Sequence, residues 1–215
     1  MRKIILLVSL AIAVSLLTRC SGDGNTYALI ETNMGDIKVL LYNETPGHKD
    51  NFVKLANEEF YNGTLFHRVI PNFMIQGGDP QSIGAAPGTM LGGGGPGYMI
   101  DNEIGAPHLR GTLAAARNNN PAKQSSGSQF YIVTGQPQSA ASLDQTERMK
   151  GIKYNETQRE AYMTEGGRPD LDQEYTVFGE VVSGMEVVDQ ISATATAAQN
   201  RPTEDVVIER VSIVR

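Results

Sequence analysis

The stretch Phe66–Pro80 reads FHRVIPNFMIQGGDP, and it sets a single arginine, Arg68, among apolar residues. If this stretch opens as a β-strand, the two-residue period puts Phe66, Arg68 and Ile70 on one face. Burying an unpaired charge is costly, so Arg68 needs a partner. Either a salt bridge or backbone carbonyls hold this arginine in place, or it belongs to a site that uses its charge.

Two later segments decide between these explanations. Gly127–Ile132 reads GSQFYI, and Tyr175–Met185 reads YTVFGEVVSGM. In order and in residue type, the three segments resemble the signature blocks of the cyclophilin-type peptidyl-prolyl cis-trans isomerases. The resemblance extends from about Tyr27 to Val214, so it covers most of the chain.

The local patterns predict a mainly β fold. Alternating apolar residues indicate strands at 27–32, 37–42, 128–134, 175–182 and 205–214, with no β-α-β rhythm between them. A helix of about 12 residues is expected at Pro46, with Thr45 as its N-cap, and another at 184–192. This pattern favours a closed antiparallel sheet. The resemblance implies a closed eight-stranded antiparallel β-barrel capped by two α-helices.

Composition and motifs argue against several other classes of protein. The chain has 215 residues and a net charge of −6, which suits one domain and gives no support for nucleic-acid binding. The glycine-rich run 92–97 lacks the Gly-Lys-Ser/Thr of a phosphate-binding loop, so a surface loop is expected. His48, His67 and His108 share no metal-ligand spacing and are interpreted as surface or packing residues. We expect no metal and no cofactor.

The resemblance also implies the site residues. Arg68 matches the catalytic arginine of the family. The apolar proline pocket matches three residues: Phe73, Met74 and Tyr131. The polar groups that orient Arg68 and the substrate backbone match Gln76 and Gln129. The remaining substrate-binding positions match Ala116, Arg117, Leu171 and Tyr175.

Some positions depart from the family pattern. The pocket-edge tryptophan of many members falls at Asp170, and the wall histidine falls at Tyr175. The usual Met-Ala-Asn segment reads Ala-Ala-Arg, ending at Arg117, which adds a positive charge at the groove rim. These changes affect the expected substrate preference and cyclosporin-type binding, while the catalytic residues remain in place.

The segment from about residue 136 to residue 170 is longer than the short connection that the family usually has there. Its charge-rich part, 146–164, predicts one or two short helices. A lid or partner surface beside the pocket is one interpretation. A tolerated surface insertion is the simpler one, because long insertions in surface loops cost little free energy.

The N-terminus has the pattern of an export signal. Arg2 and Lys3 precede an apolar run, Ile4–Leu17, that is too short for a confident membrane span, and residues 1–19 are interpreted as a signal peptide. Cys20, the only cysteine, resembles the lipid-attachment cysteine of bacterial lipoproteins, although Arg19 departs from the small residue preferred before it. Residues 20–26 are then a lipidated cysteine and tether, and residues 27–215 the isomerase domain.

These observations lead to a functional expectation. We expect a monomeric peptidyl-prolyl cis-trans isomerase that acts on X-Pro bonds of unfolded or partly folded polypeptides and assists the folding of exported proteins. The anchor would hold it on a membrane, facing the periplasm or the cell surface, with a soluble periplasmic form as the alternative. The competing function is a non-catalytic module that binds proline-containing loops.

Overall fold

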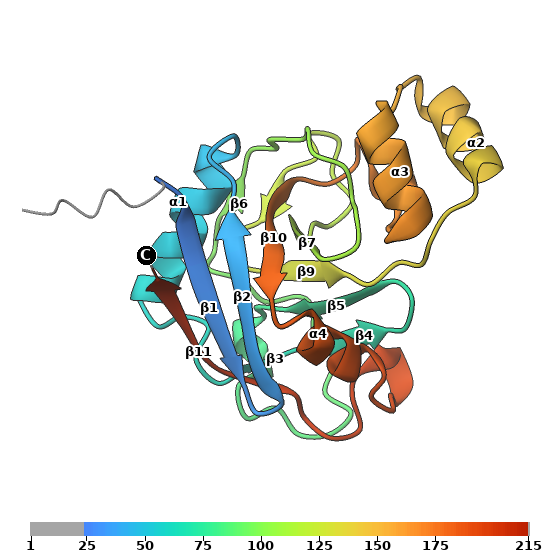
Figure 1. Ribbon diagram of the computed structural model, residues 1–215. Helices are drawn as coiled ribbons and strands as arrows, with labels where there is room; N and C mark the ends of the chain where they lie inside the picture. The colour runs from blue at the N-terminus through green and yellow to red at the C-terminus, as the bar shows by residue number, and fades with distance from the viewer. Residues whose placement is uncertain (1–23, 215) are drawn as a thin grey trace, which may run out of the picture.

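A computed structural model describes residues 24–214 (Figure 1). Its main sheet has nine strands in the spatial order β3-β11-β1-β2-β10-β7-β9-β5-β4, and all neighbouring pairs are antiparallel. The strands are β1 (Thr26–Thr32), β2 (Gly35–Leu41), β3 (Thr64–Leu65), β4 (Arg68–Ile70), β5 (Met74–Gly77), β7 (Thr112–Ala115), β9 (Phe130–Val133), β10 (Val177–Ser183) and β11 (Val207–Val214). Two short strands, β6 (Met99–Ile100) and β8 (Ser125–Ser126), form a separate pair. The mainly β prediction is confirmed.

The sheet is curled, and the predicted closed eight-stranded barrel is wrong in that detail. Its two edge strands, β3 and β4, are consecutive in the chain and separated only by Phe66 and His67. Within residues 24–214, no ladder of hydrogen bonds joins these two edges. The chain therefore does not continue as one strand through Phe66 and His67. Strand β3 pairs with β11 at one edge of the sheet, and β4 pairs with β5 at the other edge.

The interruption also changes which residues share a face. Phe66 points into the main core, where its ring lies 6.0 Å from the ring of Phe130. Ile70 instead packs against a second apolar cluster with Met74 and Tyr131. The prediction that Phe66 shares a face with Arg68 and Ile70 is therefore wrong, because the two-residue period does not continue through a break in the strand.

The main core lies inside the curl of the sheet, and two helices contribute to it. These are α1 (Pro46–Asn57) and α4 (Met185–Ser192), which lie at different ends of the sheet (Figure 1). Phe52 of α1 packs against Phe130 and Phe178 with ring centroids 5.6 and 5.7 Å apart. The apolar stripe of α4 buries Val188 and Ile191. Both helices begin within one residue of their predicted starts.

The N-terminus of α1 is stabilised by a residue that the sequence did not indicate. The Thr45 side chain makes no capping hydrogen bond. Instead, the backbone N–H groups of Gly47 and His48 each donate to the Glu103 carboxylate at 3.0 Å. A carboxylate at this position satisfies free N–H groups and opposes the positive end of the helix dipole.

The long segment between β9 and β10 holds two further helices, α2 (Ala140–Lys150) and α3 (Glu156–Thr164). They form a pair that stands beside the sheet (Figure 1). We call residues 136–170 the helical segment. It has a small core of its own, in which Leu143, Tyr154 and Tyr162 are buried. No helix among residues 24–214 has the length and hydrophobicity needed to cross a bilayer.

Three short 3-10 helices complete the described elements: Pro80–Ser82, Pro169–Leu171 and Ala198–Asn200. The predicted signal peptide and Cys20 lie outside the described residues.

Candidate functional site

Strand register brings the predicted site residues together on the outer face of the sheet. Arg68 of β4 lies directly opposite Gln76 of β5, and Gln76 lies opposite Tyr131 of β9. Met74 shares a face with Gln76, two residues away on the same strand. Residues from three strands thus meet at one place.

Nine of the ten predicted residues line a single groove of about 150 Å³, which we call the Arg68 groove. They are Arg68, Phe73, Met74, Gln76, Ala116, Arg117, Tyr131, Leu171 and Tyr175. The tenth residue, Gln129, lies beside them in an adjoining cavity of about 530 Å³ that shares Gln76, Ala116 and Arg117 with the groove.

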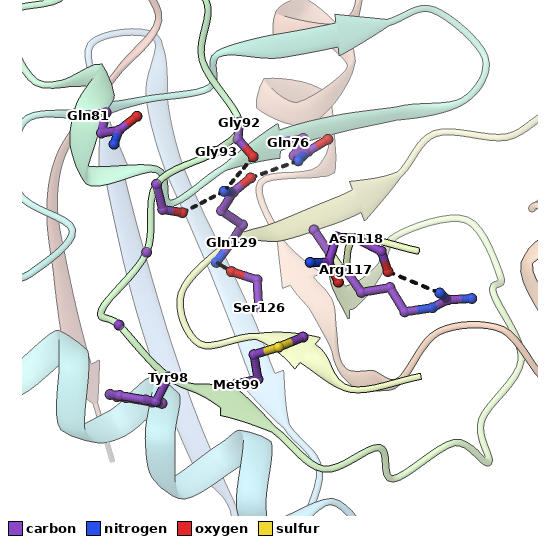
Figure 2. Close-up of a pocket in the computed structure, with 14 residues that line it drawn as sticks. Gln76, Gln81, Gly92, Gly93, Tyr98, Met99, Arg117, Asn118, Ser126 and Gln129 are labelled. Atoms are coloured by element: carbon purple, nitrogen blue, oxygen red, sulfur yellow. Dashed lines mark hydrogen bonds between the residues drawn. The ribbon is translucent and has the colours of Figure 1, made fainter. Parts of the chain in front are cut away.

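A series of side-chain hydrogen bonds orients Arg68. Its guanidinium donates from Nη1 to Gln76 Oε1 at 3.2 Å, and Gln76 Nε2 donates to Gln129 Oε1 at 3.0 Å. Gln129 Nε2 in turn donates to the carbonyl oxygens of Gly92 and Gly94 at 3.0 and 2.7 Å. Figure 2 shows Gln129 between Gln76 and this loop. The series uses one donor of Arg68, and the other guanidinium donors are available at the groove.

The glycine-rich run is held as a rigid wall of the adjoining cavity rather than as a phosphate-binding loop. It wraps around the buried carboxylate of Asp79, which accepts hydrogen bonds from the N–H groups of Gly92 at 2.5 Å and Gly94 at 3.3 Å. A Cβ atom at position 94 would lie 2.0 Å from Asp79 Oδ1, so only glycine fits there. Asp79 thereby fixes the two carbonyl groups that hold Gln129.

The floor of the Arg68 groove is apolar and buried. Met74 is 1% exposed and Tyr131 is 5% exposed, and both pack against Ala114, Val133 and Val177. Burial raises the pKa of Tyr131 well above its usual value of 10, so its phenol stays protonated. Phe73 and Leu171 form the sides of this apolar surface.

Arg117 lines the groove, and a second arginine, Arg168, lies against one of the residues that line it. Arg117 pairs with Glu174 at 3.0 Å and lies 4.8 Å from the centre of the Tyr175 ring. The expected positive charge of Arg117 is therefore partly offset by a carboxylate. Arg168 pairs with Asp170 at 2.6 Å and lies 4.0 Å from the centre of the Phe73 ring.

Sequence reasoning missed Arg168, because its place beside Phe73 depends on how the helical segment returns to the sheet. Its immediate neighbours in the sequence, Pro169 and Asp170, form no motif that indicates a site residue.

All three histidines are buried, so of the two roles considered for them, surface or packing, only packing agrees with the structure. His48 bonds to Glu103 at 2.6 Å and Ser125 at 2.9 Å, while His108 bonds to Asp172 at 2.8 Å and Tyr131 at 3.0 Å. Among the residues that the structure describes, neither ring nitrogen of His67 has a well-formed hydrogen bond. Among residues 24–214 there is no group of three or more histidine, cysteine, aspartate or glutamate side chains arranged to hold a metal ion.

Comparison with known proteins identifies the architecture. The family model described as cyclophilin type peptidyl-prolyl cis-trans isomerase/CLD matches residues 27–213. A Staphylococcus haemolyticus protein, assigned by name to the peptidyl-prolyl cis-trans isomerases, is 34% identical over 192 residues, which cover 89% of this chain and 92% of that protein.

Two more comparisons agree. A Streptococcus pyogenes protein named for both phosphatase and peptidyl-prolyl cis-trans isomerase functions is 36% identical over 86% of this chain, which spans only 38% of that longer protein. The crystal structure of a Cryptosporidium parvum cyclophilin type isomerase, determined in the presence of the dipeptide Ala-Pro, has a TM-score of 0.63 and 26% identity and covers 88% of this chain and 99% of its own.

The matched model covers most of the residues that form the sheet, the Arg68 groove and the bonds that orient Arg68. The chain therefore belongs to the cyclophilin-type peptidyl-prolyl cis-trans isomerase family, and its activity is the cis–trans isomerisation of peptidyl-prolyl bonds.

Proposed function

We propose that the Arg68 groove is the catalytic site, where a proline ring rests on the floor at Met74 and Tyr131 while Arg68 acts on the amide that precedes it. The observation that carries the proposal is the series from Arg68 through Gln76 to Gln129, which orients a permanently charged group beside an apolar floor. A cation that is already oriented needs no rearrangement when the amide twists.

The energetics of the reaction fit this arrangement. Rotation about an amide bond has a barrier of about 18–20 kcal/mol, and the uncatalysed reaction at proline takes tens to hundreds of seconds. Bringing it to milliseconds requires about 5.5–7 kcal/mol of stabilisation specific to the twisted state. As the amide twists, its nitrogen regains a lone pair, which Arg68 can bind as a donor. No bond is broken, so no nucleophile is required.

Replacing Arg68 tests this proposal. In Arg68→Ala, we expect kcat/KM for an X-Pro peptide to fall at least tenfold, or about 1.4 kcal/mol, because the group that stabilises the twisted amide is lost. Isomerisation is measured by NMR exchange on the same peptide. The matched control is Arg110→Ala, which removes an arginine paired with Asp189 outside the groove and should keep full activity.

Each outcome is informative. Catalysis that does not depend on Arg68 would overturn the proposed role while keeping the family assignment. A folded wild type that binds the peptide without isomerising it would favour the alternative function, a non-catalytic module for proline-containing loops.

The substrates and the location are part of the same proposal. The protein is a lipoprotein attached to a membrane through Cys20, and it acts as a monomer on unfolded or partly folded exported proteins in the periplasm or at the cell surface. The pattern of residues 1–20 supports export, and the completeness of the Arg68 groove within one chain supports a monomer.

Lipid labelling tests the anchor. The full-length chain should incorporate a labelled fatty acid and sediment with membranes in a bacterial host, whereas Cys20→Ser should incorporate none. A wild-type chain that is cleaved and released without label would favour the soluble periplasmic form.

A further inference from the structure

A buried polar series connects the helical segment to the floor of the Arg68 groove. At its centre is Asp172, which is 3% exposed and lies two residues after the end of the helical segment. Its Oδ2 atom accepts hydrogen bonds from the phenols of Tyr154 at 2.6 Å and Tyr162 at 2.7 Å, both contributed by the helical segment. Its Oδ1 atom accepts from the backbone N–H of His108 at 2.7 Å and lies 2.8 Å from His108 Nδ1.

The series continues from His108 to the groove. His108 is fully buried, and its Nε2 atom lies 3.0 Å from the phenol oxygen of Tyr131. The rings of His108 and Tyr131 are stacked, with 14° between their planes, and Tyr175 meets both rings edge-on. Two residues that line the groove carry a phenol hydroxyl, Tyr131 and Tyr175, and Tyr131 is the one whose hydroxyl faces His108.

The chemistry of the groups sets the direction of each hydrogen bond. An ionised carboxylate only accepts, so His108 must donate from Nδ1 to Asp172. In the tautomer that carries its single proton on Nδ1, Nε2 is an acceptor and the Tyr131 phenol donates to it. With four donors around Asp172, the charge of its carboxylate is compensated despite burial, and the tautomer and orientation of His108 follow from it.

We propose that the helical segment positions Tyr131 for catalysis through Asp172 and His108, so that Tyr154, Tyr162, Asp172 and His108 are positioning residues of the isomerase. This inference rests on the proposed function of the Arg68 groove and adds to it a role for residues 136–170. The segment is then more than a passive surface insertion, because it contacts the site through Asp172 and His108 at the floor as well as through Arg168 on Phe73.

Hydroxyl deletion tests the connection while the aromatic packing is retained. Three variants are compared with the wild type. They are the double variant Tyr154→Phe/Tyr162→Phe, the single variant Tyr131→Phe, and the triple variant that combines all three substitutions. We expect kcat/KM for an X-Pro peptide to fall about three- to tenfold in the double variant and by a similar factor in Tyr131→Phe. The triple variant should lose no more than Tyr131→Phe, because both changes break one series.

Two further measurements on the same samples separate positioning from general loosening. The ¹⁵N chemical shift of His108 Nε2 should change in both the double variant and Tyr131→Phe. Arg159→Gln is the matched control, because it removes the ion pairs of Arg159 with Asp144 and Glu147 within the helical segment and leaves Asp172 untouched. Its activity and its His108 shift should stay at the wild-type values.

Several results would overturn the inference: wild-type activity in the double variant, losses that multiply in the triple variant, or an equal loss in Arg159→Gln. If the double variant does not fold, Tyr154→Phe and Tyr162→Phe are tested singly with and without Tyr131→Phe, and the same non-additivity is expected. An inactive wild type would defeat the proposed function alone. The His108 shift and the affinity for the peptide, measured by titration, would still show whether the helical segment is coupled to Tyr131.

Discussion

At the scale of the residue, neighbours decide what a buried polar group contributes. His67 and Arg68 are adjacent, yet Arg68 has Gln76 as a partner, whereas among residues 24–214 neither ring nitrogen of His67 has a well-formed hydrogen bond. Burial lowers the pKa of His67, because a charged imidazolium is poorly solvated inside the protein. Asp79 and the backbone of Leu65 oppose this shift, and Arg68 and Arg201 reinforce it. His67 is therefore a neutral packing residue at the point where the strand is interrupted.

This environment predicts a pH dependence of stability. Burial also lowers the pKa of His48, despite its bond to Glu103. Both histidines thus have a lower pKa in the folded chain than the unfolded value of about 6.5. As the pH falls through that value, the unfolded chain binds more protons than the folded chain does. The contribution of these histidines to the free energy of unfolding is therefore at its maximum above about pH 7 and decreases towards pH 5.5. Each histidine contributes at most about 1.4 kcal/mol per pH unit.

Urea denaturation between pH 7.5 and 5.5 measures this slope. His67→Leu should show a shallower slope than the wild type, because one of the two groups is removed. The carboxylates whose pKa is lowered titrate below about pH 4.5 and do not interfere; they are Glu31, Glu103, Glu147, Asp170 and Glu174. An identical slope in wild type and His67→Leu would contradict the assignment.

At the scale of the element, local sequence predicted where helices begin better than what stabilises their ends. The start of α1 at Pro46 was predicted correctly, since proline suits the first helical turn. The prediction of Thr45 as the cap was wrong, because the capping carboxylate is that of Glu103, which lies far along the chain. In α3 the cap is local: Asn155 and Gln158 form a reciprocal capping box. A local cap can be read from spacing, whereas a tertiary cap cannot.

The distant cap makes a quantitative prediction. Glu103→Ala should lower the free energy of unfolding by about 1–2 kcal/mol, because the N–H groups of Gly47 and His48 lose their acceptor. The matched control is Glu44→Ala, which removes an exposed carboxylate just before the helix and should change stability by less than about 0.5 kcal/mol. Both values come from urea denaturation at pH 7.5. Equal losses in the two variants would mean that general charge near the helix end, and not the Glu103 hydrogen bonds, is responsible.

At the scale of the whole molecule, the curl of the sheet explains why the site lies outside the core. Inward-facing residues of the strands pack with α1 and α4, while the opposite faces of β4, β5 and β9 carry the Arg68 groove. Neighbouring residues on a strand alternate between these two roles. The helical segment stands beside the sheet and reaches the groove in two ways: its tyrosines bond to Asp172, which connects through His108 to Tyr131, and its Arg168 packs on Phe73.

The sequence by itself determined the mainly β class and the positions of five strands and of helices α1 and α4, because these depend on residue type at short spacing. Through the resemblance to the family's sequence pattern, it also determined the family and the residues that gather in the Arg68 groove. Only the tertiary structure decided that the strand breaks at Phe66 and His67, that Glu103 caps α1, and that Arg168 lies on Phe73. It also decided that Asp172 joins the helical segment to Tyr131. The physical reason is that each of these contacts joins parts of the chain whose approach depends on the curl of the sheet and the return path of long loops, which short-range periodicity does not encode.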